Sequence, residues 1–579
     1  MIPKSMRPLL PYLKRYRWGF VVGVFCVFLS NGAWVFLPQV IRHAVDDLNT
    51  AVTSRKLLHF AWQMLELAAV RGIFLFLTRW VVIGISRDIE FDLRNDLFAH
   101  LETLSYSYYQ RMRTGDIMAR VTNDLNAVRM LLGPAIMYSA NTLVFTVAAL
   151  SIMVRISPKL TFYAFLPLPV VSIVIQYFGR RIHERFERIQ AMFSDISARA
   201  QENFSGARVI RAYVQEEAEI ASFESANQEY IARSLRLVRL MGMLWPTLEF
   251  MLGLAIVLVL WIGGGEVLAG RMEIGGFAAF NIYMMQLTFP IIALGWVVNI
   301  FQRGTASLVR LNEILQEQPE ITDGIGACDL PVAGEIEFRG LNFAYDGKSV
   351  LHDLNLRIPA GTSLAIVGPT GSGKTTLVNL IPRIYDAAPG AVLMDGRPIR
   401  DFSLVSLRHN IGFVPQETFL FSERIRENIA LGVESATSQE VHDAAEAANI
   451  AADIESFPEQ YQTMVGERGI TLSGGQKQRT AIARALIRNP RILILDDALS
   501  SVDTHTEDKL LNHLRQVMQG RTTIFISHRV STVRNADRIA VLHEGRIVES
   551  GTHEELLALN GYYCELYNKQ LLEEELAEV

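Results

Sequence analysis

The stretch SLAIVGPTGSGKTTLVNLIPRI, Ser363 to Ile384, sets the architecture of the second half of the chain. Its apolar start predicts a buried strand, its glycine-rich middle a tight turn, and its end a helix. The turn GPTGSGKT, Gly368 to Thr375, has the spacing G-x-x-x-x-G-K-[ST] of a phosphate-binding loop, with a strand before it and a helix after it. In such a loop, backbone N–H groups converge on a phosphate at a helix N-terminus, Lys374 reaches the outer phosphates, and Thr375 offers its hydroxyl to Mg²⁺. We therefore predict a nucleotide site here.

The rest of the second half continues this alternation of strands and helices. ILIL is followed by Asp496, so a second strand delivers the carboxylate that this phosphate chemistry needs at the metal. The runs TTIFIS, starting at Thr522, and RIAVLHEGRIVESG, starting at Arg538, predict further strands. From about Glu335 onwards, this order predicts a soluble α/β domain made of strand–helix–strand units.

The first half is strongly apolar. The stretch from Trp18 to Ile41 has no charged residue and is long enough, at about 1.5 Å per residue, to cross a bilayer core of about 30 Å. Five further apolar stretches lie near residues 57–83, 131–154, 160–178, 241–263 and 277–298. Together, six such spans explain why a chain of 579 residues is 50% apolar and only 20% charged.

Basic residues flank these spans unevenly. They crowd the segment before the first span and the two long segments 86–130 and 179–240, so the positive-inside rule predicts that both termini are cytoplasmic. The basic start could also open a signal peptide, but no A-x-A-like site closes the apolar run, and we interpret it as a retained helix. The two long segments predict helical hairpins that extend from the membrane. We place their tips at 114–128 and 202–217, where glycine or asparagine breakers such as Gly115 are followed by short amphipathic turns. A net charge of −5 argues against a nucleic-acid partner.

LSGGQKQR, Leu472 to Arg479, lies just upstream of ILILDD and resembles the signature motif of ATP-binding cassette (ABC) transporters. Six spans followed by one such cassette resemble a half-transporter of the type IV exporter class. The resemblance implies an all-α six-helix transmembrane domain followed by an α/β P-loop nucleotide-binding domain. The corresponding boundaries are 1–310 for the membrane domain with its two long cytoplasmic loops, 311–333 for a linker, and 334–579 for the cassette. Other matching elements are Tyr345 (A-loop), Gln416 (Q-loop), VGERG at 465–469, Asp503 (D-loop) and His528 (switch histidine).

The resemblance also implies roles for these residues. Tyr345 would stack on adenine, Gln416 would touch the metal and the membrane-domain tips, and His528 would hold the γ-phosphate. The signature would bind ATP held by a second half-transporter, so a dimer is expected, with the tips serving as coupling helices. The implied activity is ATP hydrolysis coupled to transport, with ATP and Mg²⁺ as cofactors. The expected site residues are Asp497, His528 and Gln416 for catalysis; Thr375, Gln416 and Asp496 for the metal; and Tyr345, Gly368, Pro369, Thr370, Gly371, Ser372, Gly373, Lys374, Thr375, Thr376, Ser473, Gly474, Gly475, Gln476 and Asp503 for the nucleotide.

One position departs from the family pattern. The family usually has a glutamate after Asp496, where it positions or deprotonates the attacking water, and this chain has Asp497. The shorter side chain retracts the carboxylate, and a displacement of ~1 Å in catalytic geometry can cost on the order of a hundredfold in rate. This combination of a weakened site and an intact signature resembles the degenerate-site subunit of bacterial heterodimeric multidrug exporters. The alternative is an active homodimer in which Asp497 works and His528 compensates.

The cargo is less constrained by the sequence. The resemblance implies export of lipophilic or amphipathic compounds across a bacterial-type cytoplasmic membrane; a homodimeric lipid or lipid-precursor flippase and a non-transport regulatory ATPase or channel are alternatives. Three ionisable residues lie within spans, where they are costly and usually face a cavity or a partner. We predict that Glu66 and Arg71 form a structural pair. Glu249, which has no basic neighbour in its run, is a candidate contact for cationic substrates.

Overall fold

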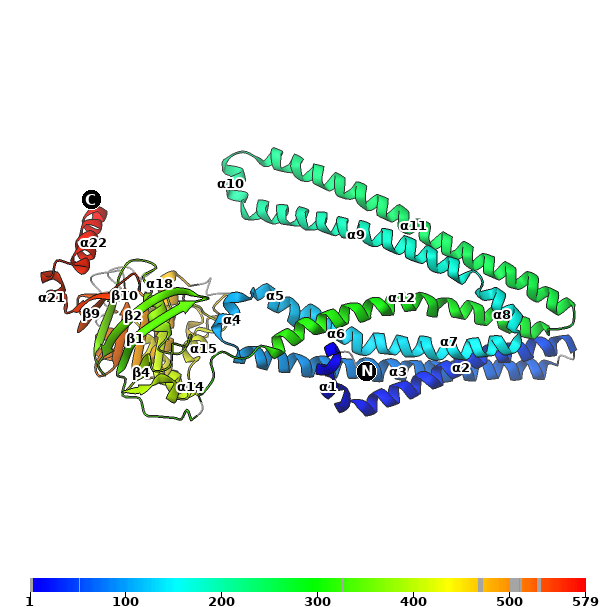
Figure 1. Ribbon diagram of the computed structural model, residues 1–579, viewed down its shortest axis with the longest axis horizontal. Coiled ribbons are helices and arrows are strands. Elements are labelled where there is room, and N and C mark those ends of the chain that lie inside the picture. The colour runs from blue at the N-terminus through cyan, green and yellow to red at the C-terminus, as the bar shows by residue number, and fades with distance from the viewer. Residues whose placement is uncertain are drawn as a thin grey trace. The chain divides into compact units, whose positions relative to one another are not determined.

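The computed structural model describes residues 4–50, 53–324, 326–466, 472–499, 510, 513–527 and 533–578. These residues form two compact units (Figure 1). The first comprises Met1–His100 with Gly115–Gln316, and the second Leu101–Thr114 with Glu317–Val579. A short segment of the N-terminal half, 101–114, is thus packed with the cassette rather than with the membrane helices.

The first unit is all helical, and six of its helical segments are long and apolar enough to cross a membrane. All six predicted spans fall within them, which confirms the predicted membrane domain. The segments run over Arg17–Leu48, Ser54–Thr103, Thr114–Ile156, Pro158–Ser205, Glu216–Leu268 and Ile274–Gln316.

Two of these segments change helix geometry along their length. The segment Thr114–Ile156 contains two π-helical turns, and in the segment Pro158–Ser205, Pro167 separates α8 from α9. Ser157, in extended conformation, caps α8 by accepting a hydrogen bond from the Leu160 N–H at 3.2 Å. The elements of this unit are η1 (Lys4–Leu9), α1 (Leu10–Arg15), α2 (Arg17–Thr50), α3 (Ser54–Thr103), α5 (Thr114–Ala119), the π-helical turn η2 (Arg120–Asp124), α6 (Leu125–Met130), the π-helical turn η3 (Leu131–Ala135), α7 (Ile136–Ile156), α8 (Pro158–Phe165), α9 (Leu168–Ser205), α10 (Ala207–Ala212), α11 (Glu216–Leu268) and α12 (Ile274–Gln316).

Helices α9 and α11 form one long hairpin that diverges from α2, α3, α7 and α12 (Figure 1). Its end is closed by the short helix α10, which lies inside the predicted tip at 202–217. That prediction is confirmed.

The predicted first tip, at 114–128, is wrong. Helix α3 ends at Thr103, and a separate short helix, α4 (Tyr106–Arg111), forms the connection before α5 begins at Thr114. Ser105 and Met112 flank α4 with extended ψ angles of 157° and 132°, so the helical backbone is interrupted at these two residues. Gly115, which suggested a break, lies inside a helix, where a single glycine costs only about 1 kcal/mol.

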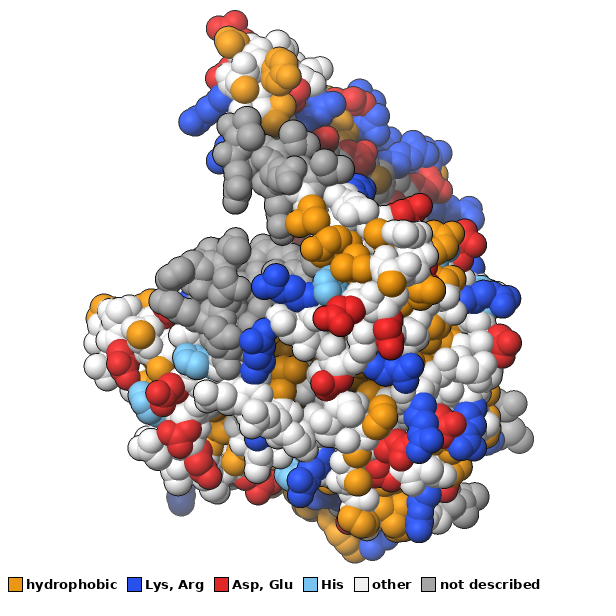
Figure 2. Space-filling view, turned by 90° about the vertical axis from the view of Figure 1, so that its left-hand side faces the viewer, with side chains coloured by type: hydrophobic (Ala, Val, Ile, Leu, Met, Phe, Trp, Pro, Cys, Tyr) orange, Lys and Arg blue, Asp and Glu red, His pale blue; other side chains and the backbone are white. Residues whose placement is uncertain are grey.

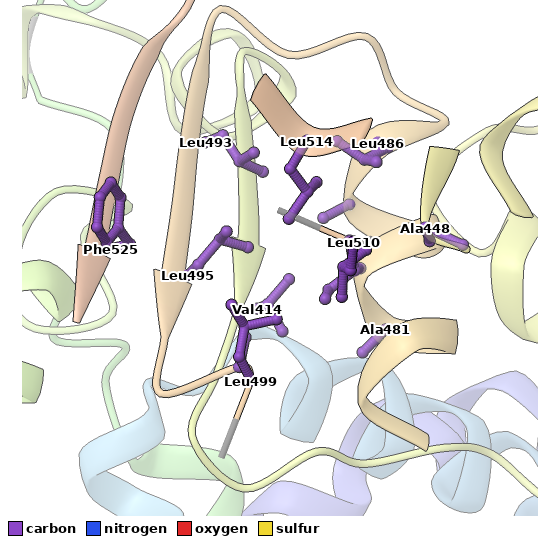
Figure 3. Packing of buried hydrophobic residues seen from close by; sticks show 14 of the residues in the cluster. Val414, Ala448, Ala481, Leu486, Leu493, Leu495, Leu499, Leu510, Leu514 and Phe525 are labelled. Atoms are coloured by element: carbon purple, nitrogen blue, oxygen red, sulfur yellow. The ribbon is translucent and has the colours of Figure 1, made fainter. Parts of the chain in front are cut away.

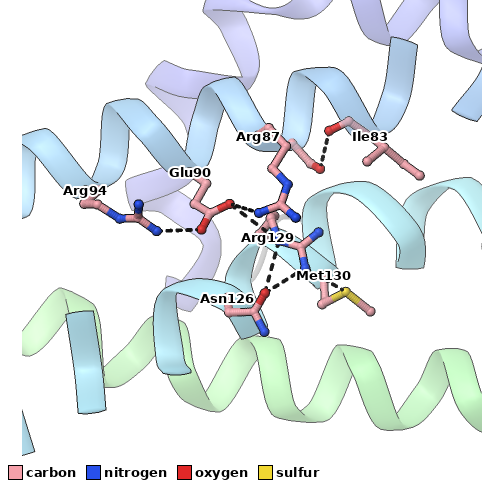
Figure 4. A network of polar contacts seen from close by, with 8 residues as sticks. Ile83, Arg87, Glu90, Arg94, Asn126, Arg129 and Met130 are labelled. Carbon is pink, nitrogen blue, oxygen red and sulfur yellow. Dashed lines mark hydrogen bonds and ion pairs between the residues drawn. The ribbon is translucent and has the colours of Figure 1, made fainter. Parts of the chain in front are cut away.

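A polar network joins α3 to α6 in the first unit (Figure 4). The carboxylate of Glu90 on α3 lies 3.0 Å from Arg87, 2.7 Å from Arg94 and 3.5 Å from Arg129 of α6. Glu90 is only 9% exposed, so it is a nearly buried anion held by three guanidinium groups. The network lies just beyond two apolar stretches, one of which ends at Ile83 and the other of which begins at Leu131.

The predicted pair between Glu66 and Arg71 is wrong as well. The guanidinium carbon of Arg71, on α3, lies 3.2 Å from the ring centroid of Trp34 on α2, and no ion pair joins Arg71 to Glu66 in the described part of the chain. Two residues five positions apart do not face each other on a helix. The face of an aromatic ring on a neighbouring helix does attract a guanidinium group, and the attraction is stronger where water is excluded.

In the second unit, one sheet of six strands and one of four form the cassette, which confirms the predicted α/β domain. The larger sheet has the order β10-β9-β3-β8-β7-β6, with β9, β3, β8, β7 and β6 parallel and β10 antiparallel at the edge. The smaller sheet, β2-β1-β4-β5, is antiparallel. The strands are β1 (Ile336–Tyr345), β2 (Lys348–Ile358), β3 (Ser363–Val367), β4 (Val392–Met394), β5 (Arg397–Pro398), β6 (Ile411–Val414), β7 (Ile492–Asp496), β8 (Thr522–Ile526), β9 (Arg538–His543) and β10 (Arg546–Gly551).

Apolar side chains fill both faces of this larger sheet, and one of the two clusters also includes residues of β1, β2 and β4 from the smaller sheet. Leu364 and Ile366 of β3 belong to one buried cluster, and Ala365 and Val367 to another, as expected for a parallel strand covered on both sides. Figure 3 shows the second cluster, in which Leu493 and Leu495 of β7 pack near Leu514. The described helices of the unit, besides α4, are α13 (Lys374–Asn379), η4 (Ile399–Asp401), α14 (Leu404–His409), α15 (Ile425–Ala430), α16 (Ser438–Ala447), α17 (Ala451–Glu455), η5 (Gln460–Gln462), α18 (Gly474–Leu486), α21 (His553–Ala558) and α22 (Tyr562–Glu578).

Basic and acidic side chains are interspersed over the face seen in Figure 2.

Candidate functional site

The phosphate-binding loop connects β3 to α13. Gly368, Gly371 and Gly373 have φ angles of 149°, 83° and 102°, which L-residues with a side chain rarely adopt. A Cβ atom on Gly368 would lie 2.0 Å from the carbonyl oxygen of Leu542, so the loop also passes too close to β9 for any larger residue. Thr370 and Gly371 are exposed at the crest of the loop.

Lys374, the first residue of α13, is folded back into this loop. Its ammonium group donates hydrogen bonds of 2.9 Å to the carbonyl oxygens of Gly368 and Pro369. The residue is 7% exposed, and desolvation lowers the pKa of the Lys374 amine. Among the described residues, the hydrogen-bond partners of this buried cation are neutral carbonyl groups, so it would gain from a directly bound anion such as a phosphate.

Asp496, at the end of β7, lies beside the loop. The Thr375 hydroxyl donates a hydrogen bond of 3.2 Å to Asp496 Oδ1, while Oδ2 is buried with no hydrogen-bond partner in the described part of the chain. Burial raises the pKa of the Asp496 carboxyl. The buried hydroxyl of Ser372 is likewise unpartnered there. A hydroxyl and a carboxylate oxygen with unused acceptor capacity form the oxygen donor set that Mg²⁺ prefers.

Gln416 and Asp497 follow neighbouring parallel strands. Val414 of β6 is in register with Leu495 of β7, so both residues emerge at the same edge of the sheet, where the loop after β3 also lies. Gln416 is exposed. Asp497 has φ +50°, and its N–H donates to the Ile526 carbonyl at 3.0 Å. Asp497 directly follows Asp496, and its negative charge adds to the effect of burial in raising the pKa of the Asp496 carboxyl.

Tyr345, at the end of β1, belongs to an aromatic cluster. Its ring centroid lies 4.9 Å from Phe343 and 5.0 Å from Tyr385, both in edge-on contacts, and its hydroxyl donates to Thr376 Oγ1 at 3.3 Å. Burial raises the pKa of Tyr345. The ring is thus fixed next to the helix that follows the phosphate-binding loop.

Helix α4 contacts the same cluster, all within the second unit. Tyr385 donates a hydrogen bond of 2.7 Å to Gln110, and its ring centroid lies 6.0 Å from that of Tyr106. Glu320, which lines the same pocket as Tyr385, accepts hydrogen bonds from Ser107 at 2.5 Å and Arg111 at 2.9 Å of α4. Sequence reasoning missed these residues; the only local signal was the aromatic run YSYYQ, 106–110.

The signature residues form the N-terminus of α18. Ser473 and Gln476 make a capping box, in which the Ser473 N–H donates to Gln476 Oε1 at 3.0 Å and Ser473 Oγ accepts from the Gln476 N–H at 3.3 Å. Gln476 also donates to Asp453 at 3.0 Å. Gly474 and Gly475 open the helix and leave its first N–H groups accessible to an anion.

Three predicted positions remain to be located. Asp503 and His528, together with 467–469 of the VGERG motif, lie outside the described residues. Glu249 lies on α11 in the first unit and lines an apolar cavity with residues of α8, α9 and α12. Of the predicted site residues, the structure brings Tyr345, the phosphate-binding loop, Thr375 and Asp496 together in one region of the cassette.

Two family models match the chain. Residues 20–291 match the ABC transporter transmembrane region, and residues 351–500 match the ABC transporter family. Both halves are thus matched in the order that the fold shows.

Full-length relatives carry the same two halves. The chain is 38% identical to the probable multidrug resistance ABC transporter ATP-binding/permease protein YheI of Bacillus subtilis, over 97% of both chains. It is 36% identical to an ATP-dependent lipid A-core flippase of Syntrophus aciditrophicus, over 96% of this chain and 93% of the flippase. A solved structure of a bacterial Atm1-family ABC exporter with ATP bound matches with a TM-score of 0.79 and 30% identity, over 96% of this chain and 99% of that one.

Proposed function

The chain belongs to the ABC transporters, and we propose that it is one half of a heterodimeric exporter of lipophilic or amphipathic compounds. Transport coupled to ATP hydrolysis, a multi-pass membrane domain and dimeric assembly are common to exporters of this kind. The choice of partner, the cargo and the residue roles are the proposal.

The cassette would bind ATP through the phosphate-binding loop. We propose that Tyr345 stacks on the adenine, that the loop N–H groups and Lys374 hold the phosphates, and that Thr375 and Asp496 hold Mg²⁺ with Gln416 nearby. Mg²⁺, when bound, neutralises charge on the β- and γ-phosphates. The unpartnered Oδ2 of Asp496 supports this metal site, because a buried carboxylate oxygen without a partner is costly unless a ligand completes it.

The second half of each ATP site would come from the partner subunit. The described hydrogen bonds of Ser473 and Gln476 are with each other and with Asp453, and none of them is with the phosphate-binding loop. We propose that Ser473, Gly474, Gly475 and Gln476 face ATP held by the partner. His528 would hold the γ-phosphate, and Asp503 would be a further nucleotide-site residue.

The departure at Asp497 supports a heterodimer. A carboxylate one methylene shorter than glutamate would leave the site on this chain able to bind ATP but slow to hydrolyse it. The partner's site, served by the intact signature of this chain, would then supply most of the turnover. Both termini would be cytoplasmic, by the distribution of basic residues around the spans.

The observation that carries the proposal is the Thr375–Asp496 contact beside the phosphate-binding loop, in one chain with six spans. The test is ATP-driven movement of a fluorescent lipophilic dye into inverted membrane vesicles that contain the assembled dimer. We expect accumulation with wild-type protein and ATP, and none when ATP is left out. ATP hydrolysis without dye movement would contradict export of such compounds.

A lipid flippase is the second candidate, because a relative at 36% identity is a lipid A-core flippase. In that case, the vesicles would move a labelled lipid between leaflets and leave the dye outside.

A further inference from the structure

The start of α18 is held by a carboxylate from another helix of the cassette. Asp453, on the short helix α17, accepts a hydrogen bond of 3.0 Å from Gln476 Nε2 through one oxygen. Its other oxygen accepts a hydrogen bond of 2.8 Å from the guanidinium group of Arg479. Gln476 and Arg479 lie three positions apart on α18, so one carboxylate bridges two side chains on the same face of that helix.

The position of this carboxylate is set by packing around it. Ile454, the next residue after Asp453, is fully buried and belongs to the same apolar cluster as Ile482 of α18. Arg479 is only 9% exposed, and its guanidinium group also donates to the carbonyl oxygen of Asn449, just before α17. Both partners of the ion pair are therefore anchored, and Gln476 must adapt to them.

The chemistry of a carboxylate decides how the Gln476 side chain is oriented. An ionised carboxylate accepts hydrogen bonds and donates none, so the NH₂ group of the Gln476 amide faces Asp453. The amide oxygen is thereby left for the Ser473 N–H, which donates to it at 3.0 Å. A flipped amide would set oxygen against oxygen at Asp453 and donor against donor at Ser473. Asp453 thus supports the capping box that opens α18.

We propose that Asp453 is a positioning residue for ATP hydrolysis at the site that the signature completes. It acts through Gln476 on the backbone at Ser473, and so on the first N–H groups of α18, which are suited to hold a phosphate. The guanidinium group of Arg479 compensates the negative charge of Asp453, which would otherwise repel an anion at this end of the helix. This inference rests on the proposed function, in which the signature faces ATP held by the partner.

The test compares ATP hydrolysis with ATP binding in the purified, assembled dimer. Asp453→Asn keeps the shape of the side chain but replaces one acceptor oxygen by an NH₂ group, so one oxygen is left for two donors. The charged Arg479 competes better for that oxygen, and Gln476 then faces a donor. We expect kcat to fall about tenfold, as for the loss of one charge-assisted hydrogen bond. Binding of a fluorescent ATP analogue to the phosphate-binding loops should be unchanged.

Asp453→Glu separates acceptor chemistry from shape. It keeps an acceptor-only carboxylate, and the side chain of Asp453 is 32% exposed, which leaves room for a further methylene group. We expect a kcat close to that of wild type and well above that of Asp453→Asn. A role in packing alone predicts the opposite order, because asparagine conserves the volume of the side chain and glutamate does not.

The matched control is Glu455→Gln. It neutralises a carboxylate on the same short helix, one that lies 3.7 Å from His442. We expect wild-type hydrolysis from this variant. Thermal unfolding of all variants is followed in parallel, and Asp453→Ala, which removes the acceptor without adding a donor, takes the place of Asp453→Asn if that variant does not fold.

A double variant shows whether Asp453 acts through Gln476. Gln476→Ala alone should lower kcat, because the Ser473 N–H loses its acceptor. Asp453→Asn added to Gln476→Ala should lower kcat little further, since two changes in one hydrogen-bond relay are not additive.

Wild-type kcat in Asp453→Asn, or in Asp453→Ala where that variant takes its place, would overturn the inference. Fully additive losses in the double variant, no effect of Gln476→Ala, or an equal loss in Asp453→Glu and Asp453→Asn would overturn it as well. If the vesicles accumulate dye and Asp453→Asn hydrolyses ATP like wild type, this inference fails and the proposed function stands. If the variants behave as expected but no lipophilic compound is moved in vesicles, the proposed export fails and the positioning role stands.

Discussion

The hydroxyl of Tyr385 donates a hydrogen bond of 2.7 Å to the side-chain oxygen of Gln110, and this bond ties α4 to the cassette. The same tyrosine packs edge-on against Tyr345 at 5.0 Å. One side chain therefore contacts both the residue expected to stack on adenine and the helix that joins two membrane spans.

Tyr385→Phe should uncouple these two contacts. The ring and its packing against Tyr345 remain, so we expect ATP affinity to be unchanged, while the lost hydrogen bond costs about 1 kcal/mol of stability between α4 and the cassette. If α4 is a coupling helix, stimulation of ATP hydrolysis by transported compounds should fall, whereas basal hydrolysis should not. The measurement is ATPase rate with and without a lipophilic compound.

Tyr461→Phe is the matched control. It removes a tyrosine hydroxyl that lies 3.1 Å from His442 within the helical part of the cassette. Stimulation should survive this change, and an equal loss of stimulation in both variants would contradict a specific role for the Tyr385–Gln110 bond.

Asp497→Glu should raise ATP hydrolysis at this chain's own site. The added methylene moves the carboxylate toward the position that the family's glutamate occupies, and we expect a gain of about tenfold or more at that site. Because Asp497 has φ +50°, a conformation that aspartate tolerates better than glutamate, thermal unfolding should be followed in parallel. Brisk hydrolysis by this chain purified alone, abolished by Asp497→Asn, would instead establish an active homodimer.

The sequence was sufficient for those parts of the molecule that have local signals. The phosphate-binding loop was predictable because Gly368 and Gly373 occupy backbone conformations that nearly demand glycine. The spans were predictable because a run of about 18 or more apolar residues is typical of a membrane helix. The first tip was misplaced because Gly115 looked like a helix breaker, whereas the real breaks at Ser105 and Met112 carry no such signal.

Contacts between distant segments left no pattern in the sequence. Arg71 was predicted to pair with a carboxylate five residues away on its own helix, but it stacks on Trp34 of another helix. The bond between Gln110 and Tyr385 joins residues 275 positions apart and was equally out of reach. Such pairings depend on how helices pack, which periodicity alone does not specify.

Asp496→Asn should stabilise the nucleotide-free cassette at neutral pH. Burial raises the folded-state pKa of Asp496 above that of an unfolded aspartate, so folding favours the protonated acid and the wild-type protein loses stability as the pH rises through that pKa. The variant has no charge to desolvate, and we expect it to gain on the order of 1 kcal/mol at neutral pH. Thermal unfolding at several pH values measures this, and the advantage should shrink as the pH falls.

The same variant should respond less to Mg²⁺ and ATP. Wild-type protein should unfold at a higher temperature when both are added, because ligands that bind only the folded state stabilise it. Asp496→Asn lacks one of the oxygens that we propose hold Mg²⁺, and it should gain less. A variant that is destabilised at every pH and still gains fully from Mg²⁺ would argue against this position as the metal site.

Two glycines of the phosphate-binding loop should respond differently to alanine. At Gly368, a Cβ would lie 2.0 Å from the Leu542 carbonyl oxygen, whereas at Gly371 it would meet no atom within 4 Å. Gly368→Ala should therefore lower the thermal stability of the cassette clearly, by more than Gly371→Ala, whose cost is limited to about 1 kcal/mol of backbone strain. Gly371→Ala should instead weaken binding of ATP, measured by titration with a fluorescent analogue. Equal stability of the two variants would contradict the close approach of the loop to β9.

Glu90→Gln should destabilise the membrane domain through its three arginine partners. Arg87, Arg94 and Arg129 would be left close together without the carboxylate between them, and we expect a loss of about 1–3 kcal/mol, larger at low salt because screening is then weaker. Thermal unfolding in detergent at two salt concentrations measures both the loss and its salt dependence. Glu229→Gln is the control, since its single bond to Arg233 is an exposed pair of the kind that contributes at most about 1 kcal/mol. If the two variants unfold at the same temperature at both salt concentrations, the network around Glu90 does not stabilise the junction of α3 and α6.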